Sequence, residues 1–213
     1  MFIQGIETFG WKNAIRGMRY SFNSESASDS NYILPILGEN DKKLMLNLIL
    51  GGSAHRKFLR AIHVQMSVNM SMKWWKQFDT YKIATTALSR STMHTLMKET
   101  LTRNNFEPFE HSKALDDIID FLNNLIQQYN TLKITPNINK YELERVMNTV
   151  FDILPMSFLQ ERIIDTNYEV LLNMLHQRQT HKLKEWHFFC NTLLAEVPYL
   201  KEFYDATKGA KNA

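Results

Sequence analysis

The sequence contains very little cysteine, glycine and proline. Cys190 is the single cysteine among 213 residues, so one chain can form neither an internal disulfide nor a zinc site built from several thiolates. This usage favours a reducing, cytoplasmic location. With 7 glycines and 5 prolines, the chain is also unlike loop-rich or disordered proteins. Its hydrophobic content of 44% is sufficient for a sizeable core.

Long apolar runs and a strong bias of charge are also absent. No run reaches about 18 residues, so no transmembrane span is predicted. The first residues, MFIQGIETFG, lack the basic and apolar regions of a secretory signal. The 25 basic and 22 acidic residues leave a net charge of +3, and no long basic stripe occurs. Neither a membrane nor a nucleic acid is therefore a predicted partner.

The common catalytic motifs are missing as well: there is no Walker loop, GxGxxG, GxSxG, HExxH or CxxC pair. His181 and Glu185 stand four residues apart on a predicted helix and could share one face. Two ligands without a third favour a solvated ion pair over a metal site. The sequence therefore predicts no metal.

Hydrophobic patterning predicts an α+β fold with a small, mainly antiparallel sheet and many packed helices. We expect one domain over 1–213, with an αβ portion in 1–105 and a helical portion in 106–213. Residues 1–6 and 56–69 alternate as strands do. Residues 7–20 and 38–52 predict helices, the second capped by Asn40 or Asp41 and ended by Gly51 and Gly52. The polar run 21–30 predicts a loop, more simply a solvated connector than a ligand loop.

Residues from 111 onward predict helices almost throughout. The segment 112–133 places apolar residues on one stripe, and 139–154 predicts a second helix, stopped by Pro155. One or two further helices are expected over 156–197, before Pro198.

The stretch WWKQFDTYKIATTALSRSTMH, residues 74–94, combines core-like and motif-like residues. The indoles of Trp74 and Trp75 are expected in the core because of their size. The remainder resembles the signature of the flavin-dependent thymidylate synthase (ThyX) family, which is Arg-His-Arg, seven residues, then Ser-x-Arg-Tyr. Tyr81-Lys82-Ile83 take the places of Arg-His-Arg, and Ser91 matches the serine. Met93 stands in place of the arginine and His94 in place of the tyrosine.

Three further stretches are similar to the family and run in its order. AIRGMRYSFNSESASDS is similar to the opening helix and the Ser/Asp-containing loop. GGSAHRKFLRAIHV is similar to a Ser/Thr-Glu-His segment that enters a strand, with His55 as the histidine. LLNMLHQRQTHKLKEWHFF is similar to a late helix, and it supplies Arg178, His181 and Trp186.

The resemblance implies an enzyme that methylates dUMP to dTMP with FAD, NADPH and methylenetetrahydrofolate, and that forms a homotetramer with shared active sites. It places His55, Tyr81, Lys82 and His94 near the flavin. It assigns Ser91 and Arg178 to catalysis. The same resemblance places Ser91, Arg178 and His181 near the nucleotide monophosphate.

The signature of this chain offers one lysine where the family has three arginines, so three hypotheses stay open. In the first, the chain is an active or altered flavin- and nucleotide-dependent enzyme. In the second, it is an inactive relative that binds a nucleotide. In the third, it is an interaction protein with exposed aromatic residues at Trp11, Tyr20 and Phe22. Other cations near the same segments either compensate for the lost arginines or are solvated surface charges. They are Arg16, Arg19, Arg56, Lys57, Arg60 and Arg90. His55, similarly, is either a ligand contact or an ordinary loop histidine.

Overall fold

The computed structural model describes residues 1–32, 36–109 and 112–210. The chain divides into two compact units, each built from separate stretches of sequence. The first unit comprises Met1–Phe2, Val68–Asp79 and Ser89–Arg162, and the second comprises Ile3–Ser67, Thr80–Leu88 and Ile163–Ala213. Among the described residues, no helix combines the length and the apolar character needed to cross a membrane.

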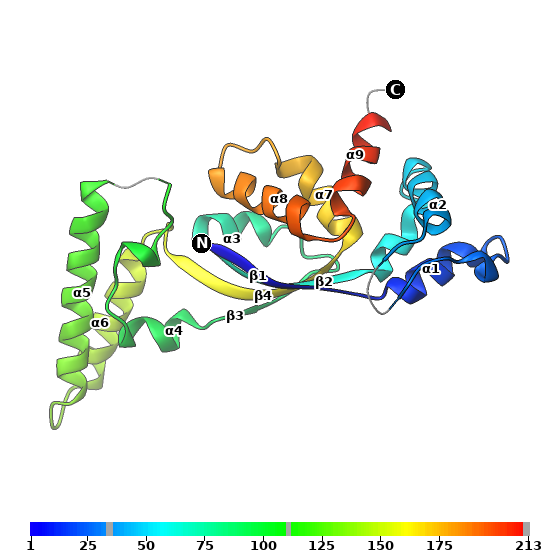
Figure 1. Ribbon diagram of the computed structural model, residues 1–213. Helices are drawn as coiled ribbons and strands as arrows, with labels where there is room; N and C mark the ends of the chain where they lie inside the picture. Colours follow the sequence, from blue (N-terminus) through cyan, green and yellow to red (C-terminus); the bar gives the residue numbers. More distant parts are fainter. Residues whose placement is uncertain (33–35, 110–111, 211–213) are drawn as a thin grey trace. The chain divides into compact units, whose positions relative to one another are not determined.

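A small antiparallel sheet has four strands in the order β1-β2-β4-β3 (Figure 1). They are β1 (Phe2–Phe9), β2 (His63–Ser71), β3 (Thr86–Ser89) and β4 (Leu159–Asn167). Along β2, Val64, Met66, Val68 and Met70 are buried, and the residues between them are exposed or half-buried. This alternation is typical of a sheet with one face against a core. The fold class is therefore the predicted α+β arrangement of a small sheet with many helices.

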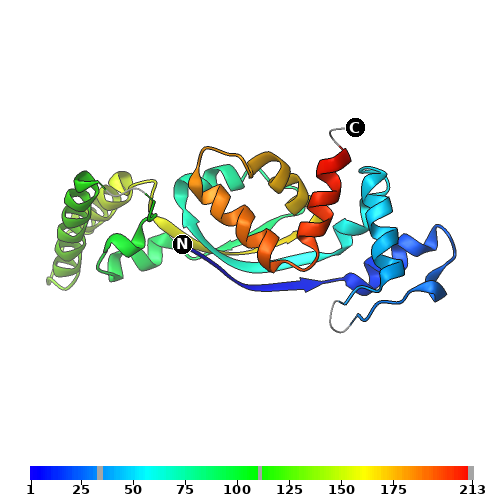
Figure 2. The ribbon, with the colours of Figure 1, turned by 45° about the horizontal axis from the view of Figure 1, so that its top comes forward.

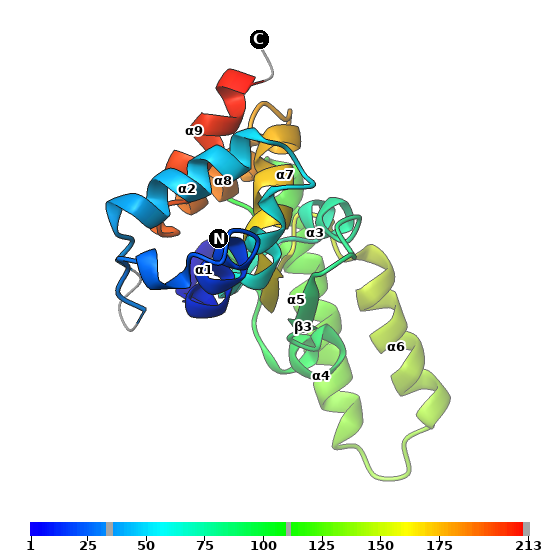
Figure 3. The same ribbon diagram turned by 90° about the vertical axis from the view of Figure 1, so that its right-hand side faces the viewer.

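The first unit carries a helical hairpin made of α5 (Lys113–Lys133) and α6 (Lys140–Ile153), which lie side by side (Figure 3). Leu115, Ile119, Leu122 and Ile126 form one buried stripe of α5 and share a core cluster with Val150 of α6. The remaining helical segments of this unit are α3 (Met72–Phe78), α4 (Thr92–Thr95), η3 (Leu96–Lys98) and η4 (Arg103–Asn105). The 3.6-residue period of the sequence thus predicted both long helices correctly.

Helix α3 carries the two adjacent tryptophans into the core, where Trp74 is 0% and Trp75 1% exposed. Their ring centres are 4.8 Å apart, and Phe78 stacks on Trp74 at 5.0 Å. Ser71 caps the helix by accepting a hydrogen bond from the Trp74 N–H at 3.3 Å. The prediction that both indoles are core residues is confirmed.

The second unit contains most of the helices. They are α1 (Trp11–Tyr20), η1 (Glu25–Ala27), α2 (Glu39–Leu50), η2 (Arg56–Ala61), α7 (Tyr168–Arg178), α8 (Lys184–Glu196) and α9 (Leu200–Ala210). Helices α2 and α9 contact each other, as do α7, α8 and α9 (Figure 2). Trp11 packs edge-on against Tyr168 with ring centres 5.3 Å apart. The core of this unit therefore joins the N-terminal helices α1 and α2 to the C-terminal helices α7 and α9.

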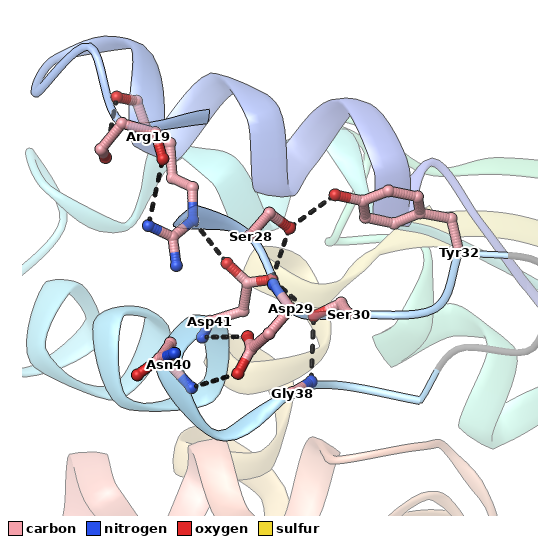
Figure 4. A network of polar contacts seen from close by, with 9 residues as sticks. Arg19, Ser28, Asp29, Ser30, Tyr32, Gly38, Asn40 and Asp41 are labelled. Atoms are coloured by element: carbon pink, nitrogen blue, oxygen red, sulfur yellow. Dashed lines mark hydrogen bonds and ion pairs between the residues drawn. The ribbon is translucent and has the colours of Figure 1, made fainter. Parts of the chain in front are cut away.

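A buried carboxylate organises the polar loop after α1 (Figure 4). Asp41 is 0% exposed and accepts hydrogen bonds from Arg19 Nε at 2.6 Å, Ser28 Oγ at 2.7 Å, Ser30 Oγ at 2.6 Å and the Asp29 N–H at 3.2 Å. Burial alone would raise the pKa of Asp41, but the hydrogen bonds from Ser30, Ser28 and Arg19 hold it below its usual value. The polar residues of this loop are therefore used inside the protein, and the loop is more than the solvated connector that the sequence predicted.

The N-terminus of α2 is capped from outside the helix. Asp29 accepts hydrogen bonds from the N–H groups of Asn40 at 2.9 Å and Asp41 at 3.1 Å, whereas the structure assigns the N-cap position to Gly38 without a side-chain bond. A Cβ at Gly38 would lie 2.2 Å from Cγ of Asp29. The prediction that Asn40 or Asp41 caps the helix is wrong because both residues are already helical and donate to Asp29.

Three predicted segments differ from the structure. Residues 7–9 belong to strand β1, where the sequence predicted helix. Residues 56–61 form the 3₁₀ helix η2, and the strand begins only at His63. The neighbours Phe58 and Leu59 are both buried, and adjacent residues of a strand would point to opposite faces. Residues 159–167 form β4, where the sequence predicted helix, because the apolar spacing of this segment fits neither period well.

The prediction that Trp11 is exposed is also wrong. Its side chain is 4% exposed, and its Nε1–H donates to Thr8 Oγ1 at 3.0 Å. Tyr20 and Phe22 are exposed at 54% and 66%, as the sequence predicted.

Candidate functional site

Tyr81 and Arg178, which are 97 positions apart in sequence, meet in the second unit. The Tyr81 hydroxyl accepts a hydrogen bond from Arg178 Nε at 2.8 Å and donates one to Gln177 Oε1 at 2.8 Å. The Arg178 guanidinium carbon also lies 5.5 Å from the centre of the Tyr81 ring. Arg178 is thereby held by both the oxygen and the ring of one tyrosine.

Trp186 and His181 complete this cluster. The guanidinium carbon of Arg178 lies 5.1 Å from the Trp186 ring centre, within the range of a cation–π contact. Trp186 is 0% exposed, so its indole packs against the arginine and is not accessible to a ligand. His181 lies edge-on to Trp186 at 6.4 Å. Burial, and then the charge of Arg178, lower the pKa of His181 and favour its neutral form.

Local structure fixes the positions of these side chains. Arg178 is the last residue of α7, where the negative end of the helix dipole favours a cation. Tyr81 follows α3 and precedes β3, and the hydroxyls of Thr85 and Thr166 are 3.0 Å apart, which holds the intervening loop against β4. Ala84 has a φ of 56° within the same loop. The turn is therefore specified by contacts and not by glycine.

A cleft of about 520 Å³, which we call the Tyr81 cleft, opens beside Tyr81. It is lined by Arg56, Arg60, Thr80, Tyr81, Ile83, Ala84, Asn167, Glu169, Val170 and Asn173. Its size is typical of a small-molecule site. Arg56 Nε and Nη2 both donate to Glu169 Oε1 at 3.1 Å, so this arginine is largely neutralised. The exposed Arg60 adds a positive charge to the rim.

His55 lies in a different pocket of the same unit, which we call the His55 pocket. This pocket measures about 600 Å³ and is mainly apolar, with Met18, Leu48 and Phe58 among its lining residues and Lys57 beside them. A Cβ at Gly51 would lie 3.2 Å from the His55 ring, so the glycine leaves room for the imidazole. The family resemblance placed both His55 and Tyr81 near the flavin. In the structure the two residues line different pockets, and residues of η2 line each of them.

Ser91 and His94 belong to the first unit, at the start of α4. The Ser91 carbonyl accepts from the His94 N–H at 3.3 Å and from Thr95 Oγ1 at 3.0 Å. Lys82 is an exposed residue of the second unit. Within the units, the structure therefore joins Tyr81, Arg178 and His181 in one cluster and Ser91 and His94 in another.

Several cations that could replace the missing signature arginines are already paired. Arg19 is bonded to the buried Asp41 and Arg56 to Glu169. Arg90 Nη1 lies 3.9 Å from Glu161 Oε2, and both side chains are partly exposed. Arg19 and Arg56 are thus committed to acids that sequence reasoning did not identify, since their partners are 22 and 113 positions away.

His181 and Glu185 do not share a helix face, because α8 begins at Lys184 and His181 precedes it. His181 Nδ1 accepts a hydrogen bond from the Leu183 N–H at 3.1 Å. In the part of the chain that the structure describes, no three His, Cys, Asp or Glu residues are grouped as a metal site would need.

Comparison with solved structures gives close matches over nearly the whole chain. Flavin-dependent thymidylate synthase ThyX from Helicobacter pylori, complexed with FAD and dUMP, superposes with a TM-score of 0.73 at 18% identity. The match covers 97% of this chain and 99% of that one. A second H. pylori ThyX structure with FAD and dUMP gives 0.73 at 17% identity, with the same coverage. This chain has the ThyX fold.

This chain is also similar, with a lower TM-score, to a UMP/dUMP methylase, PolB from Streptomyces cacaoi bound with 5-Br dUMP. Its TM-score is 0.63 at 12% identity, and the match covers 98% of this chain and 95% of that one. No protein-family model and no curated protein sequence matches the chain. At these identities the likeness establishes the fold, and the sites must be argued from the residues themselves.

Proposed function

We propose that the whole chain forms one ThyX-like domain that binds a pyrimidine nucleotide monophosphate, with dUMP as the first candidate. The observation that carries the proposal is the cluster in which Tyr81 and Trp186 hold the Arg178 guanidinium beside the Tyr81 cleft. A guanidinium fixed in this way is suited to a phosphate. The H. pylori and S. cacaoi proteins of this fold are bound to dUMP and 5-Br dUMP in their crystals.

In this proposal the residues have distinct roles. Arg178 supplies the charge that meets the nucleotide, and Tyr81 orients it. His181, which is favoured in its neutral form, offers a hydrogen bond near the same arginine without adding charge. Ser91 contributes a hydroxyl to the nucleotide, as the family signature implies.

The residues beside η2 fit a flavin in part. The Tyr81 cleft offers tyrosine and arginine, and the His55 pocket offers apolar walls with His55 and Lys57. The basic and hydrogen-bonding groups are suited to the pyrophosphate of FAD, and the apolar walls are suited to its ring system. FAD would be held by Arg60, Tyr81 and His55, with Lys82 and His94 as further predicted contacts. When bound, it would supply hydride transfer in a reaction that uses NADPH and methylenetetrahydrofolate.

A second candidate function is nucleotide binding without turnover. Arg19 is paired with Asp41 and Arg56 with Glu169. These ion pairs favour binding without turnover, because the two arginines are then not available to bind the phosphates of a cofactor and a substrate. The exposed Tyr20 and Phe22 suit a protein-interaction role in addition, although they name no partner.

Two measurements on the purified protein test the proposal. Flavin binding predicts a yellow protein whose flavin absorbance follows it through gel filtration, since a tightly held cofactor co-purifies. Nucleotide binding predicts a calorimetric titration with dUMP that saturates, and a much weaker one with deoxyuridine, which lacks the phosphate. Heat with dUMP from a colourless protein would favour the inactive relative, and no heat with dUMP, dTMP or UMP would contradict the proposed function.

A further inference from the structure

The segment Arg90–Thr92, which contains Ser91, has few supports of its own. It follows β3, whose four residues are all exposed, and leads into α4, which is only four residues long. Ser91 and Arg90 are themselves exposed. A short, exposed segment of this kind opens easily unless other residues hold it.

Strand β4 holds this segment through one backbone and two side-chain hydrogen bonds. The Arg90 N–H donates to the Glu161 carbonyl at 2.9 Å. Gln160 Nε2 donates to the Arg90 carbonyl at 3.4 Å and to Thr92 Oγ1 at 3.2 Å. Gln160 therefore contacts the residues on both sides of Ser91.

Arg162 determines which way the Gln160 amide points. Arg162 Nε donates to Gln160 Oε1 at 3.0 Å. A guanidinium has donors only, so the amide oxygen must face Arg162 and the NH₂ group must face the Arg90 carbonyl. The arginine thus fixes the orientation in which Gln160 can donate to the segment.

Arg162 is in turn held from two directions within the same unit. Its Nη1 donates to Asp79 Oδ1 at 2.8 Å, and its guanidinium carbon lies 4.3 Å from the centre of the Trp75 ring. Trp75 is 1% exposed, and its Nε1–H donates to the Gln160 carbonyl at 2.8 Å. A continuous series of contacts therefore runs from the tryptophan core to the two neighbours of Ser91.

We propose that Gln160, oriented by Arg162, is a positioning residue that holds the Arg90–Thr92 segment in the conformation that binds the nucleotide. This role rests on the proposed function, since it concerns Ser91 as a nucleotide contact. Gln160 acts through its neighbours and need not touch the ligand. Sequence reasoning could not identify it, because it is about 70 positions from the segment that it holds.

Two substitutions distinguish the role of the Gln160 amide N–H, which donates to the segment, from that of its oxygen, which accepts from Arg162. Gln160→Glu keeps the oxygen that accepts from Arg162 and loses the N–H donor, whereas Gln160→Met removes both without adding charge. We expect both to raise the dUMP dissociation constant about tenfold, the change that the loss of one or two neutral hydrogen bonds produces. Gln128→Met, at an exposed glutamine of α5 in the same unit, is the matched control and should bind like the wild type.

Hydrogen exchange of the intact protein tests the anchoring itself. Peptides that cover residues 86–95 should exchange about tenfold faster in both Gln160 variants, while peptides from α5 stay unchanged. A melting temperature close to that of the wild type in Gln160→Glu would distinguish positioning from general unfolding.

The outcomes separate this inference from the proposed function. If the wild type binds dUMP and both Gln160 variants bind it with the same affinity, the positioning role is overturned. A wild-type protein that does not bind dUMP would contradict the proposed function. The exchange rates of residues 86–95 would then test the anchoring alone, and equal rates in the wild type and both variants would contradict it.

Discussion

Two arginines of the second unit differ in what surrounds them. Arg19 is 5% exposed and is neutralised by the buried Asp41, whereas Arg178 lies against the rings of Tyr81 and Trp186. An aromatic face attracts a guanidinium without cancelling its charge. Arg19 is therefore committed to a buried acid, whereas the contacts of Arg178 include the ring of Tyr81, a residue that lines the Tyr81 cleft. This position makes Arg178 the candidate ligand contact.

Asp41 is the residue on which the loop after α1 depends. We expect Asp41→Asn to lower the free energy of unfolding by about 3–5 kcal/mol, because Arg19 would remain buried without its counter-charge. Urea denaturation measures this change. Asp117→Asn, at an exposed site on α5, should be nearly neutral, and equal stability of the two variants would contradict the role given to Asp41.

The same carboxylate gives a prediction for acid. Because the hydrogen bonds from Ser30, Ser28 and Arg19 lower the pKa of Asp41 in the folded state, its contribution is complete at pH values well above the unfolded pKa of about 4. The contribution is lost as the pH falls through the lower, folded value. Denaturation curves below about pH 4 should therefore be less pH-dependent in Asp41→Asn than in the wild type.

Tyr81 offers a mild test of the Arg178 cluster. Tyr81→Phe keeps the ring and removes the hydroxyl that accepts from Arg178 Nε. The dUMP dissociation constant should rise about fivefold to tenfold because the guanidinium becomes less ordered. Tyr141→Phe, at a tyrosine 72% exposed on α6, is the control. Equal affinities for dUMP in the two variants would remove Tyr81 from the proposed site.

At the scale of elements, the sequence predicted the long helices well and the short segments poorly. The stripe from Leu115 to Ile126 determines α5 whatever surrounds it, since one buried face is enough to specify a helix. Strand β4 depends on tertiary pairing, because distant parts of the chain bind the polar side chains of Gln160, Arg162 and Asp165. Helix α9 follows Pro198, where the prediction ended.

The capping of α2 gives the prediction at this scale. Asp29→Ala removes the acceptor for two N–H groups at the helix start and should cost about 0.5–2 kcal/mol, the range of a lost N-cap. Thermal or urea unfolding measures it. Glu144→Ala, at an exposed glutamate of α6, provides the comparison, and no difference between the two would contradict capping by Asp29.

For the whole molecule, the ThyX resemblance predicted the fold, but the contacts of the site could not be read from one sequence. Tyr81 and Arg178 were both candidates, yet their hydrogen bond joins residues 97 positions apart. The Arg56–Glu169 pair and the Gln160 contacts have separations of 113 and 70. Such pairs depend on how strands and helices assemble, and periodicity reports only on local structure.

The ThyX resemblance also makes a prediction about assembly. We expect a homotetramer of the 25.1-kDa chain, with sites shared between subunits, as closed symmetry would allow. Size-exclusion chromatography with light scattering measures the mass directly. A monomer at all concentrations would contradict the homotetramer with shared sites that the resemblance implies.

The most direct test of the account is a calorimetric titration of dUMP into the wild type, Arg178→Ala and Arg145→Ala. Arg145 is an exposed arginine of α6 and serves as the matched control. The account predicts saturable binding to the wild type and to Arg145→Ala, and a loss of affinity of about tenfold or more in Arg178→Ala, since a charge-assisted hydrogen bond contributes about 1.5–3 kcal/mol. Equal affinities of all three proteins for dUMP would contradict the claim that Arg178 holds the nucleotide.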